Sequence, residues 1–231
     1  MSTKYVANAR KILCIGRNYA AHIQELNEVA PLQPFFFLKP SLAILAPDQG
    51  PFLVPRGTCV QHEVELAVVL NRDLKNLPET FSAAGALESI AGYALSIDMT
   101  ARNVQDEAKK KGLPWTIAKG FDTFLPLSRF VPKEKIPDPY NVQLELSVNG
   151  EVRQSDKTKL MLFPIHKILS HMSCMMTLQK GDIILTGTPK GVGIVRPGDK
   201  VHASMSVDGE VIEELGLDSV EKDGPYIYKE T

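Results

Sequence analysis

Residues 60–70, "VQHEVELAVVL", combine two glutamates with a run of apolar residues. Side chains of a β-strand alternate between its two faces, so Glu63 and Glu65 point the same way, toward the face that continues through Ala67 and Val69. Charged groups are costly in such an apolar strand unless they are paired. The stretch therefore predicts a buried strand whose two same-face glutamates lie beside a cationic partner.

The bulk composition sets the expected size and partners. The 231 residues suffice for one large domain, and a hydrophobic content of 44% supports a sizeable core, so we expect a single domain over residues 1–231. A formal net charge of -1 gives no reason to expect nucleic acid or an anionic membrane as a partner. Three lysines at positions 109–111 are typical of a solvated helix end. No apolar stretch is long enough to predict a transmembrane helix.

The cysteines indicate the compartment. Cys14, Cys59 and Cys174 are odd in number, widely spaced and without a CxxC pair, which argues against a disulfide framework or a structural zinc site. A reducing, intracellular location follows. The first residues lack the apolar core of a secretory signal, and whether an organelle presequence has been removed stays open.

The rest of the chain contains more predicted strand than helix. Hairpin turns are expected at Asn149-Gly150 and Asp208-Gly209, each between alternating strands. We therefore predict an α+β fold, a folded-over mixed β-sheet of the roll or sandwich type with a few flanking helices, rather than a doubly wound sheet. The helices are expected within residues 17–26, 77–90, 99–112 and 163–178.

A third carboxylate strengthens the prediction of a site. Asp98 ends a second predicted buried strand, and with Glu63 and Glu65 it offers the hard oxygen ligands that suit Mg²⁺, Mn²⁺ or Ca²⁺. Any one of the three is explained as a surface carboxylate, and Asp98 also as a helix cap. The joint pattern favours a metal site.

Polar residues that follow Asp98 suit a carboxylate-bearing ligand. Arg102 and Gln105 lie one helical turn apart, and Arg binds carboxylates through a bidentate fork. The alternative is a solvent-exposed helix face. Lys119 follows a tryptophan and apolar residues, which makes it a candidate for a partly desolvated lysine.

Two further segments contribute candidates. His22 and Glu25 are three residues apart on a predicted helix, where the carboxylate would orient the imidazole as a general base, although an exposed helix pair is the alternative. The segment "GTPKGVG", residues 187–193, does not match the GxxxxGK[ST] phosphate loop, which excludes that kind of nucleotide site. Thr188 and the backbone amides around it suit a small anion.

With these residues assembled, the chain resembles the fumarylacetoacetate hydrolase superfamily, in the short single-domain branch that includes acylpyruvases. The resemblance implies that residues 1–231 form a single catalytic domain of the mixed-β roll type, commonly a homodimer, with a lid helix at about residues 18–28. The matching stretches are residues 14–22, 35–40, 62–70, 96–124 and 181–193.

The resemblance also assigns roles to individual residues. It implies a Mg²⁺ or Mn²⁺ ion held by Glu63, Glu65 and Asp98. It implies that His22 with Glu25 activates water, while Lys119 adds positive charge. The substrate contacts that it implies are Arg17, Lys39, Arg102, Gln105 and Thr188.

Three reactions are associated with this branch. We expect an enzyme of 2-oxo (pyruvoyl) acids that works through a metal-stabilised pyruvate enolate, with acylpyruvate hydrolysis or oxaloacetate decarboxylation placed ahead of oxaloacetate keto-enol tautomerisation. A protein of another class, a non-catalytic binder of metal and dicarboxylate, is the rival. Eukaryotic relatives of this branch are often mitochondrial and bacterial ones cytoplasmic.

Overall fold

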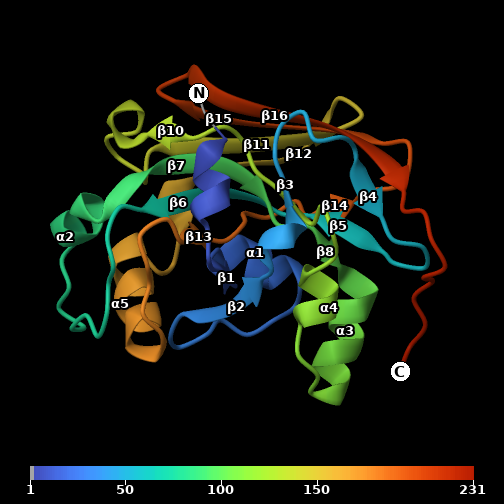
Figure 1. Ribbon diagram of the computed structural model, residues 1–231, viewed down its shortest axis with the longest axis horizontal. Coiled ribbons are helices and arrows are strands. Elements are labelled where there is room, and N and C mark those ends of the chain that lie inside the picture. The colour runs from blue at the N-terminus through green and yellow to red at the C-terminus, as the bar shows by residue number, and fades with distance from the viewer. Residues whose placement is uncertain (1–2) are drawn as a thin grey trace.

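The computed structural model describes residues 3–231, and it contains two principal β-sheets (Figure 1). The six-stranded sheet has the order β10-β7-β6-β13-β1-β2, and its pairs are antiparallel except for the parallel pair of β1 and β13. Its strands are β1 (Ile12–Gly16), β2 (Phe35–Lys39), β6 (Val64–Leu70), β7 (Ile90–Ile97), β10 (Val131–Pro132) and β13 (Ile183–Leu185).

The five-stranded sheet has the order β12-β11-β15-β16-β4 and consists mainly of hairpins. Its strands are β4 (Phe52–Val54), β11 (Val142–Val148), β12 (Glu151–Lys157), β15 (Lys200–Val207) and β16 (Glu210–Glu221). The two hairpins predicted at Asn149-Gly150 and Asp208-Gly209 are confirmed, with positive φ at all four residues, as a type I′ turn requires.

Short elements complete the chain. Two small sheets contain β3 (Ile44–Leu45) with β9 (Leu125–Pro126), and β5 (Val60–His62) between β8 (Thr100–Ala101) and β14 (Gly193–Ile194). The helices are α1 (Ala20–Glu25), α2 (Ala83–Glu88), α3 (Arg102–Lys111), α4 (Thr116–Lys119) and α5 (Ile165–Met175). Short 3-10 helices in the described residues are η1 (Lys4–Asn8), η2 (Ser41–Ala43), η3 (Lys133–Lys135) and η4 (Thr158–Leu160).

The layers explain the burial patterns of the strands. In Figure 1 the five-stranded sheet crosses the top of the molecule, β6 and β7 run beneath it, and α1, α3, α4 and α5 lie below. Every residue of β6 is buried, whereas β11 alternates between buried and partly exposed residues. β6 is thus covered on both faces, and the predicted α+β fold with mixed β-sheets is confirmed.

The helices are shorter than their sequence patterns suggested. Ser82 caps α2 by accepting a hydrogen bond from the Gly85 amide, and Gly112 ends α3 with a φ of 69°. The expected helix at residues 17–26 is reduced to the six residues of α1, because Arg17 adopts a φ of 59° and interrupts any helix there. Across residues 3–231, the longest helix falls short of what a membrane crossing needs.

Candidate metal centre and active site

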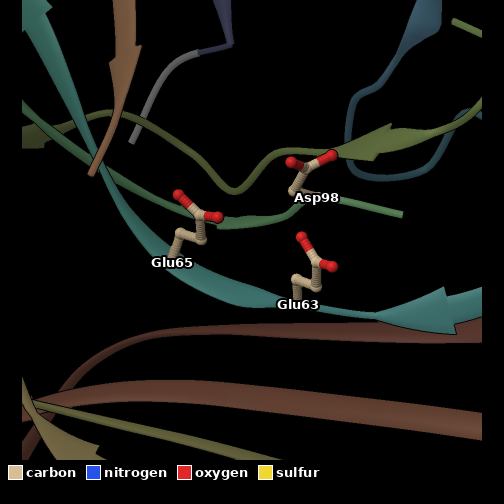
Figure 2. A group of neighbouring side chains, drawn as sticks. All are labelled: Glu63, Glu65 and Asp98. Carbon is tan, nitrogen blue, oxygen red and sulfur yellow. The ribbon is translucent and has the colours of Figure 1, made fainter. Parts of the chain in front are cut away.

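Three carboxylates converge where β6 and β7 meet (Figure 2). Glu63, Glu65 and Asp98 each offer one oxygen, and these oxygens lie within 4.8 Å of one another. All three residues are buried, with relative exposures of 6%, 1% and 1%. The carboxylates that the sequence predicted as a metal site are therefore brought together.

The antiparallel pairing of β6 and β7 positions them. Val64 is paired with Ile97, and the amide of Asp98 donates a hydrogen bond to the carbonyl of Glu63 at 2.8 Å, so these two acids face each other at the end of the ladder. The expected single strand over residues 60–70 is interrupted at Glu63, between β5 and β6. Asp98 does not cap α3, whose N-cap is Ala101.

The predicted cationic partner is confirmed, and three basic side chains supply it. Lys119 bridges two acids, with Nζ donating to Asp98 Oδ2 at 2.7 Å and to Glu63 Oε2 at 2.9 Å. Lys39 Nζ lies 2.7 Å from Asp98 Oδ1. The guanidinium of Arg102 donates to Glu63 Oε1 at 2.5 Å. Lys39 and Lys119 are themselves buried, so these pairs are shielded from water.

The surroundings shift the pKa values of Glu65 and Glu63 in opposite directions. Burial, Asp98 and Glu63 together raise the pKa of Glu65 well above its usual value, against one hydrogen bond from the Gly187 amide at 2.5 Å. Burial would also raise the pKa of Glu63, but Lys119 and Arg102 outweigh it and lower that pKa. Without a further cation, the surroundings of Glu65 therefore favour its protonated form more than water does.

A divalent cation fits this donor set. Asp98 Oδ1 is fully buried, and its partner in the described part of the chain is the Lys39 ammonium at 2.7 Å. Glu65 receives a hydrogen bond from Gly187 only at Oε2. Hard carboxylate oxygens of this kind suit Mg²⁺ or Mn²⁺, which would also relieve the repulsion among the three acids.

A small pocket opens above the carboxylates. Its volume of about 30 Å³ is enough for about one water molecule. The lining combines the acids with cations and aromatic rings, so it is shaped and charged for a small anion. The residues around it are Ile15, Gly16, Arg17, His22, Leu26, Glu28, Phe37, Glu63, Glu65, Arg102, Gln105, Lys109, Trp115, Lys119 and Thr188.

The two residues predicted as an acid/base pair, His22 and Glu25, are in contact on α1. His22 is buried, and its Nδ1 lies 3.1 Å from Glu25 Oε2. Glu25 accepts in turn from the Gly191 amide at 3.0 and 3.2 Å, which anchors α1 to the glycine-rich loop. The alternative of an exposed helix pair does not hold for His22, because its ring faces the pocket.

Of the residues predicted to contact the ligand, four line the pocket and Lys39 does not. Arg102 and Gln105 are both buried and joined by a hydrogen bond of 2.5 Å, so the alternative of a solvent-exposed helix face is excluded. Arg17 and Thr188 also line the pocket. Lys39 does not: its ammonium donates to the carbonyls of Met99 and Lys119, behind the carboxylates, and contacts Asp98.

Sequence reasoning missed two contributors. Gln154, on β12, is a buried hub whose amide contacts His62 Nδ1 at 2.9 Å and donates to Thr188 Oγ1 at 2.8 Å. The local sequence does not mark it, because Gln154 is the one buried residue of β12 and the strand shows no alternating pattern. Lys109 lies at the exposed end of α3, as expected, and its ammonium also binds Glu28 at 2.6 Å and lies over the Trp115 ring.

The fold and site define a mixed-β protein with a buried acidic centre, suited to a divalent cation, beneath a cationic pocket. Comparison with known proteins gives the family: residues 11–216 match the fumarylacetoacetate (FAA) hydrolase C-terminal family. The chain belongs to the fumarylacetoacetate hydrolase family.

Individual relatives cover nearly all of the chain. It is 47% identical over 260 residues to a mitochondrial oxaloacetate tautomerase of Saccharomyces cerevisiae, with all of both chains covered. It is 43% identical to a mitochondrial oxaloacetate decarboxylase of Dictyostelium discoideum, covering 88% of this chain and 92% of the relative. These relatives are enzymes.

Two solved structures share the fold. A fumarylacetoacetate hydrolase family protein from yeast superposes with a TM-score of 0.91 at 46% identity, covering 99% of this chain and 100% of the other. A fumarylpyruvate hydrolase from Pseudomonas aeruginosa, in complex with Mn²⁺ and pyruvate, gives a TM-score of 0.83 at 32% identity, covering 93% and 91%.

Proposed function

We propose that this protein is a divalent-metal-dependent enzyme that interconverts the keto and enol forms of oxaloacetate. The observation that carries the proposal is the buried cluster of Glu63, Glu65 and Asp98, whose two glutamates line a pocket together with cations and His22. The tautomerase from Saccharomyces cerevisiae supports the choice of reaction, and the Mn²⁺ and pyruvate bound to the Pseudomonas aeruginosa hydrolase support the metal and the 2-oxo acid.

The proposed chemistry follows from the residues present. A divalent cation held by the three carboxylates would polarise the 2-oxo group and stabilise negative charge that develops on its oxygen. Arg102 and Gln105 hold the adjacent carboxylate of the substrate through charge-assisted hydrogen bonds. Asp98 and Glu63 outweigh burial and raise the pKa of Lys119, so this lysine keeps its proton and acts as a fixed positive charge.

Tautomerisation needs only proton movement. His22, oriented by Glu25, takes a proton from the C3 carbon of the keto form to give the enolate, and returns this proton to the 2-oxo oxygen to give the enol. The reverse reaction returns a proton to C3. No attacking water is required.

Decarboxylation is the second candidate, favoured by the relative from Dictyostelium discoideum. The same pocket would stabilise the enolate left after CO₂ departs from oxaloacetate, with His22 delivering the proton to C3. Acylpyruvate hydrolysis, placed first with decarboxylation on the sequence alone, stays a prediction. It needs room for both an acyl group and an attacking water.

The reaction is tested by proton NMR of the purified protein with Mg²⁺. Oxaloacetate and acetylpyruvate are supplied separately, each with a chelator control. We expect chelator-sensitive acceleration of keto-enol exchange in oxaloacetate. Chelator-sensitive formation of pyruvate from oxaloacetate would make the protein a decarboxylase, and acetate plus pyruvate from acetylpyruvate would make it a hydrolase. If neither substrate changes in a metal-dependent way, the result favours the rival hypothesis of a non-catalytic binder of metal and dicarboxylate.

Replacing His22 by Ala is expected to lower turnover about 10²- to 10³-fold, because a positioned acid/base group contributes on this scale. Mg²⁺ affinity should remain nearly unchanged, since His22 is assigned to proton transfer and not to ligation. Turnover is measured at saturating Mg²⁺, and affinity by titration calorimetry. His202→Ala, at an exposed histidine on β15, is the control. An equal loss of turnover and metal affinity would contradict the assignment.

The location is proposed from the same relatives. Both named enzymes are mitochondrial, and we infer a mitochondrial location for this protein in a eukaryotic cell. A homodimer, a single catalytic domain over residues 1–231 and a lid at about residues 18–28 remain proposals. The lid is supported by the contact of α1 with the pocket and by the anchoring of Glu25 on the glycine-rich loop.

A further inference from the structure

The mouth of the pocket holds a carboxylate that belongs to the chain itself. Glu28 follows α1, and its side chain is 14% exposed. Arg17 Nε donates to Glu28 Oε2 at 2.6 Å, and Lys109 Nζ donates to Glu28 Oε1 at 2.6 Å. Each oxygen of this carboxylate thus has its own cation, and all three residues line the pocket.

Aromatic rings hold both cations in place. The guanidinium of Arg17 lies 5.9 Å from the centroid of the Phe35 ring, and the ammonium of Lys109 lies 5.7 Å from that of Trp115. The two rings meet edge to face at 5.2 Å. Because cation–π contacts orient the cations independently of Glu28, the four residues form a preorganised carboxylate receptor.

Glu28 occupies this receptor as a carboxylate, and the segment that follows it makes few packing contacts. Burial raises the pKa of Glu28, but the hydrogen bonds from Lys109 and Arg17 outweigh it and lower that pKa, so the carboxylate is ionised at neutral pH. The segment after Glu28 packs little: Val29 is 81% exposed and Leu32 is fully exposed. Segments with few buried contacts open at low free-energy cost.

We propose that Arg17 and Lys109 bind the distal carboxylate of a 2-oxo dicarboxylate, and that Glu28 occupies this receptor until the substrate displaces it. This inference rests on the proposed function, in which the first carboxylate lies deeper, beside Arg102. The pocket of about 30 Å³ is too small for a four-carbon acid, so entry requires the segment with Glu28 to move. A monocarboxylate gains nothing from the two cations, which makes them the determinants of specificity.

The test compares two acids that share a four-carbon 2-oxo skeleton. Oxaloacetate carries a carboxylate where 2-oxobutyrate carries a methyl group. Affinities are measured by titration calorimetry with Mg²⁺ present. We expect the wild type to bind oxaloacetate at least about tenfold more tightly, and Lys109→Met to remove most of that preference while leaving 2-oxobutyrate affinity unchanged. Lys110→Met, at the next and exposed position of α3, should keep the preference.

Glu28→Gln provides an independent test of displacement. Because a neutral amide competes less well for two cations, this variant should bind oxaloacetate about fivefold more tightly, with 2-oxobutyrate unchanged. A residue with only a structural role would instead weaken both ligands. Weaker oxaloacetate binding in Glu28→Gln overturns the displacement.

The remaining outcomes separate this inference from the proposed function. Equal affinity of the wild type for the two acids, no binding of either, or an unchanged preference in Lys109→Met overturns the assignment of the receptor. If oxaloacetate is still turned over in a metal-dependent way, the proposed function survives that result. If the binding preference for oxaloacetate over 2-oxobutyrate depends on Lys109 but oxaloacetate is not turned over, the receptor is supported and the proposed enzymatic function is refuted.

Discussion

Glu65→Gln should lower Mg²⁺ affinity by at least about tenfold and turnover by about 10³-fold, because a neutral amide is a poor ligand for a hard cation. The folded protein without metal should not lose stability. Burial, Asp98 and Glu63 raise the pKa of Glu65 and so favour its neutral form, which an isosteric amide resembles. Titration calorimetry measures affinity, and urea unfolding in the presence of a chelator measures stability.

The control for this variant is Glu88→Gln, at an exposed glutamate at the end of α2. It should leave affinity, turnover and stability unchanged. Unaltered Mg²⁺ affinity in Glu65→Gln would refute the proposed metal centre. A loss of several kcal/mol in the chelated protein would show instead that Glu65 is ionised and paired in the folded state.

Lys119→Met should destabilise the metal-free protein by about 3–5 kcal/mol, the usual cost of removing one partner of a buried ion pair. The variant leaves Glu63 and Asp98 facing each other without the ammonium that bridges them at 2.9 and 2.7 Å. The loss of stability should be larger at pH 8 than at pH 5. Removing the Lys119 ammonium raises the pKa of Glu63, and this carboxyl can then take up a proton at the lower pH. Urea unfolding at both pH values measures it.

Mg²⁺ affinity and turnover should respond differently to Lys119→Met. Mg²⁺ should recover part of the lost stability, since it supplies the missing positive charge, and its affinity should be retained or increased. Turnover should nevertheless fall sharply, because the fixed charge beside the substrate oxygen is gone. Lys135→Met, at an exposed lysine in η3, is the control. A stability change below about 1 kcal/mol would contradict the ammonium bridge.

Part of the site could be predicted because its signals are local. The period of two in a strand places Glu63 and Glu65 on one face, and α-helical spacing places Arg102 and Gln105 together. Each of these pairs is brought together by the structure. The resemblance to a family added the role of His22, which spacing alone left open between a dyad and an exposed pair.

The other part depends on residues that are far apart in the sequence. Lys109 and Glu28 are separated by 81 positions and Gln154 and Thr188 by 34, and nothing near any of them indicates its partner. The position of Lys39 is another example: a strand end beside proline predicts a surface lysine as readily as one buried against Asp98. Such contacts arise only when the whole sheet has formed.

The sequence by itself determined the elements whose cause is local: the hairpins at Asn149-Gly150 and Asp208-Gly209, the end of α3 at Gly112, and an apolar strand that carries two glutamates. Tertiary structure alone decided which charges meet. The cost of burying a carboxylate requires a partner but does not specify where in the chain that partner lies. Strand order and packing select Lys39, Arg102 and Lys119 for the buried carboxylates of Glu63 and Asp98, and Arg17 and Lys109 for Glu28.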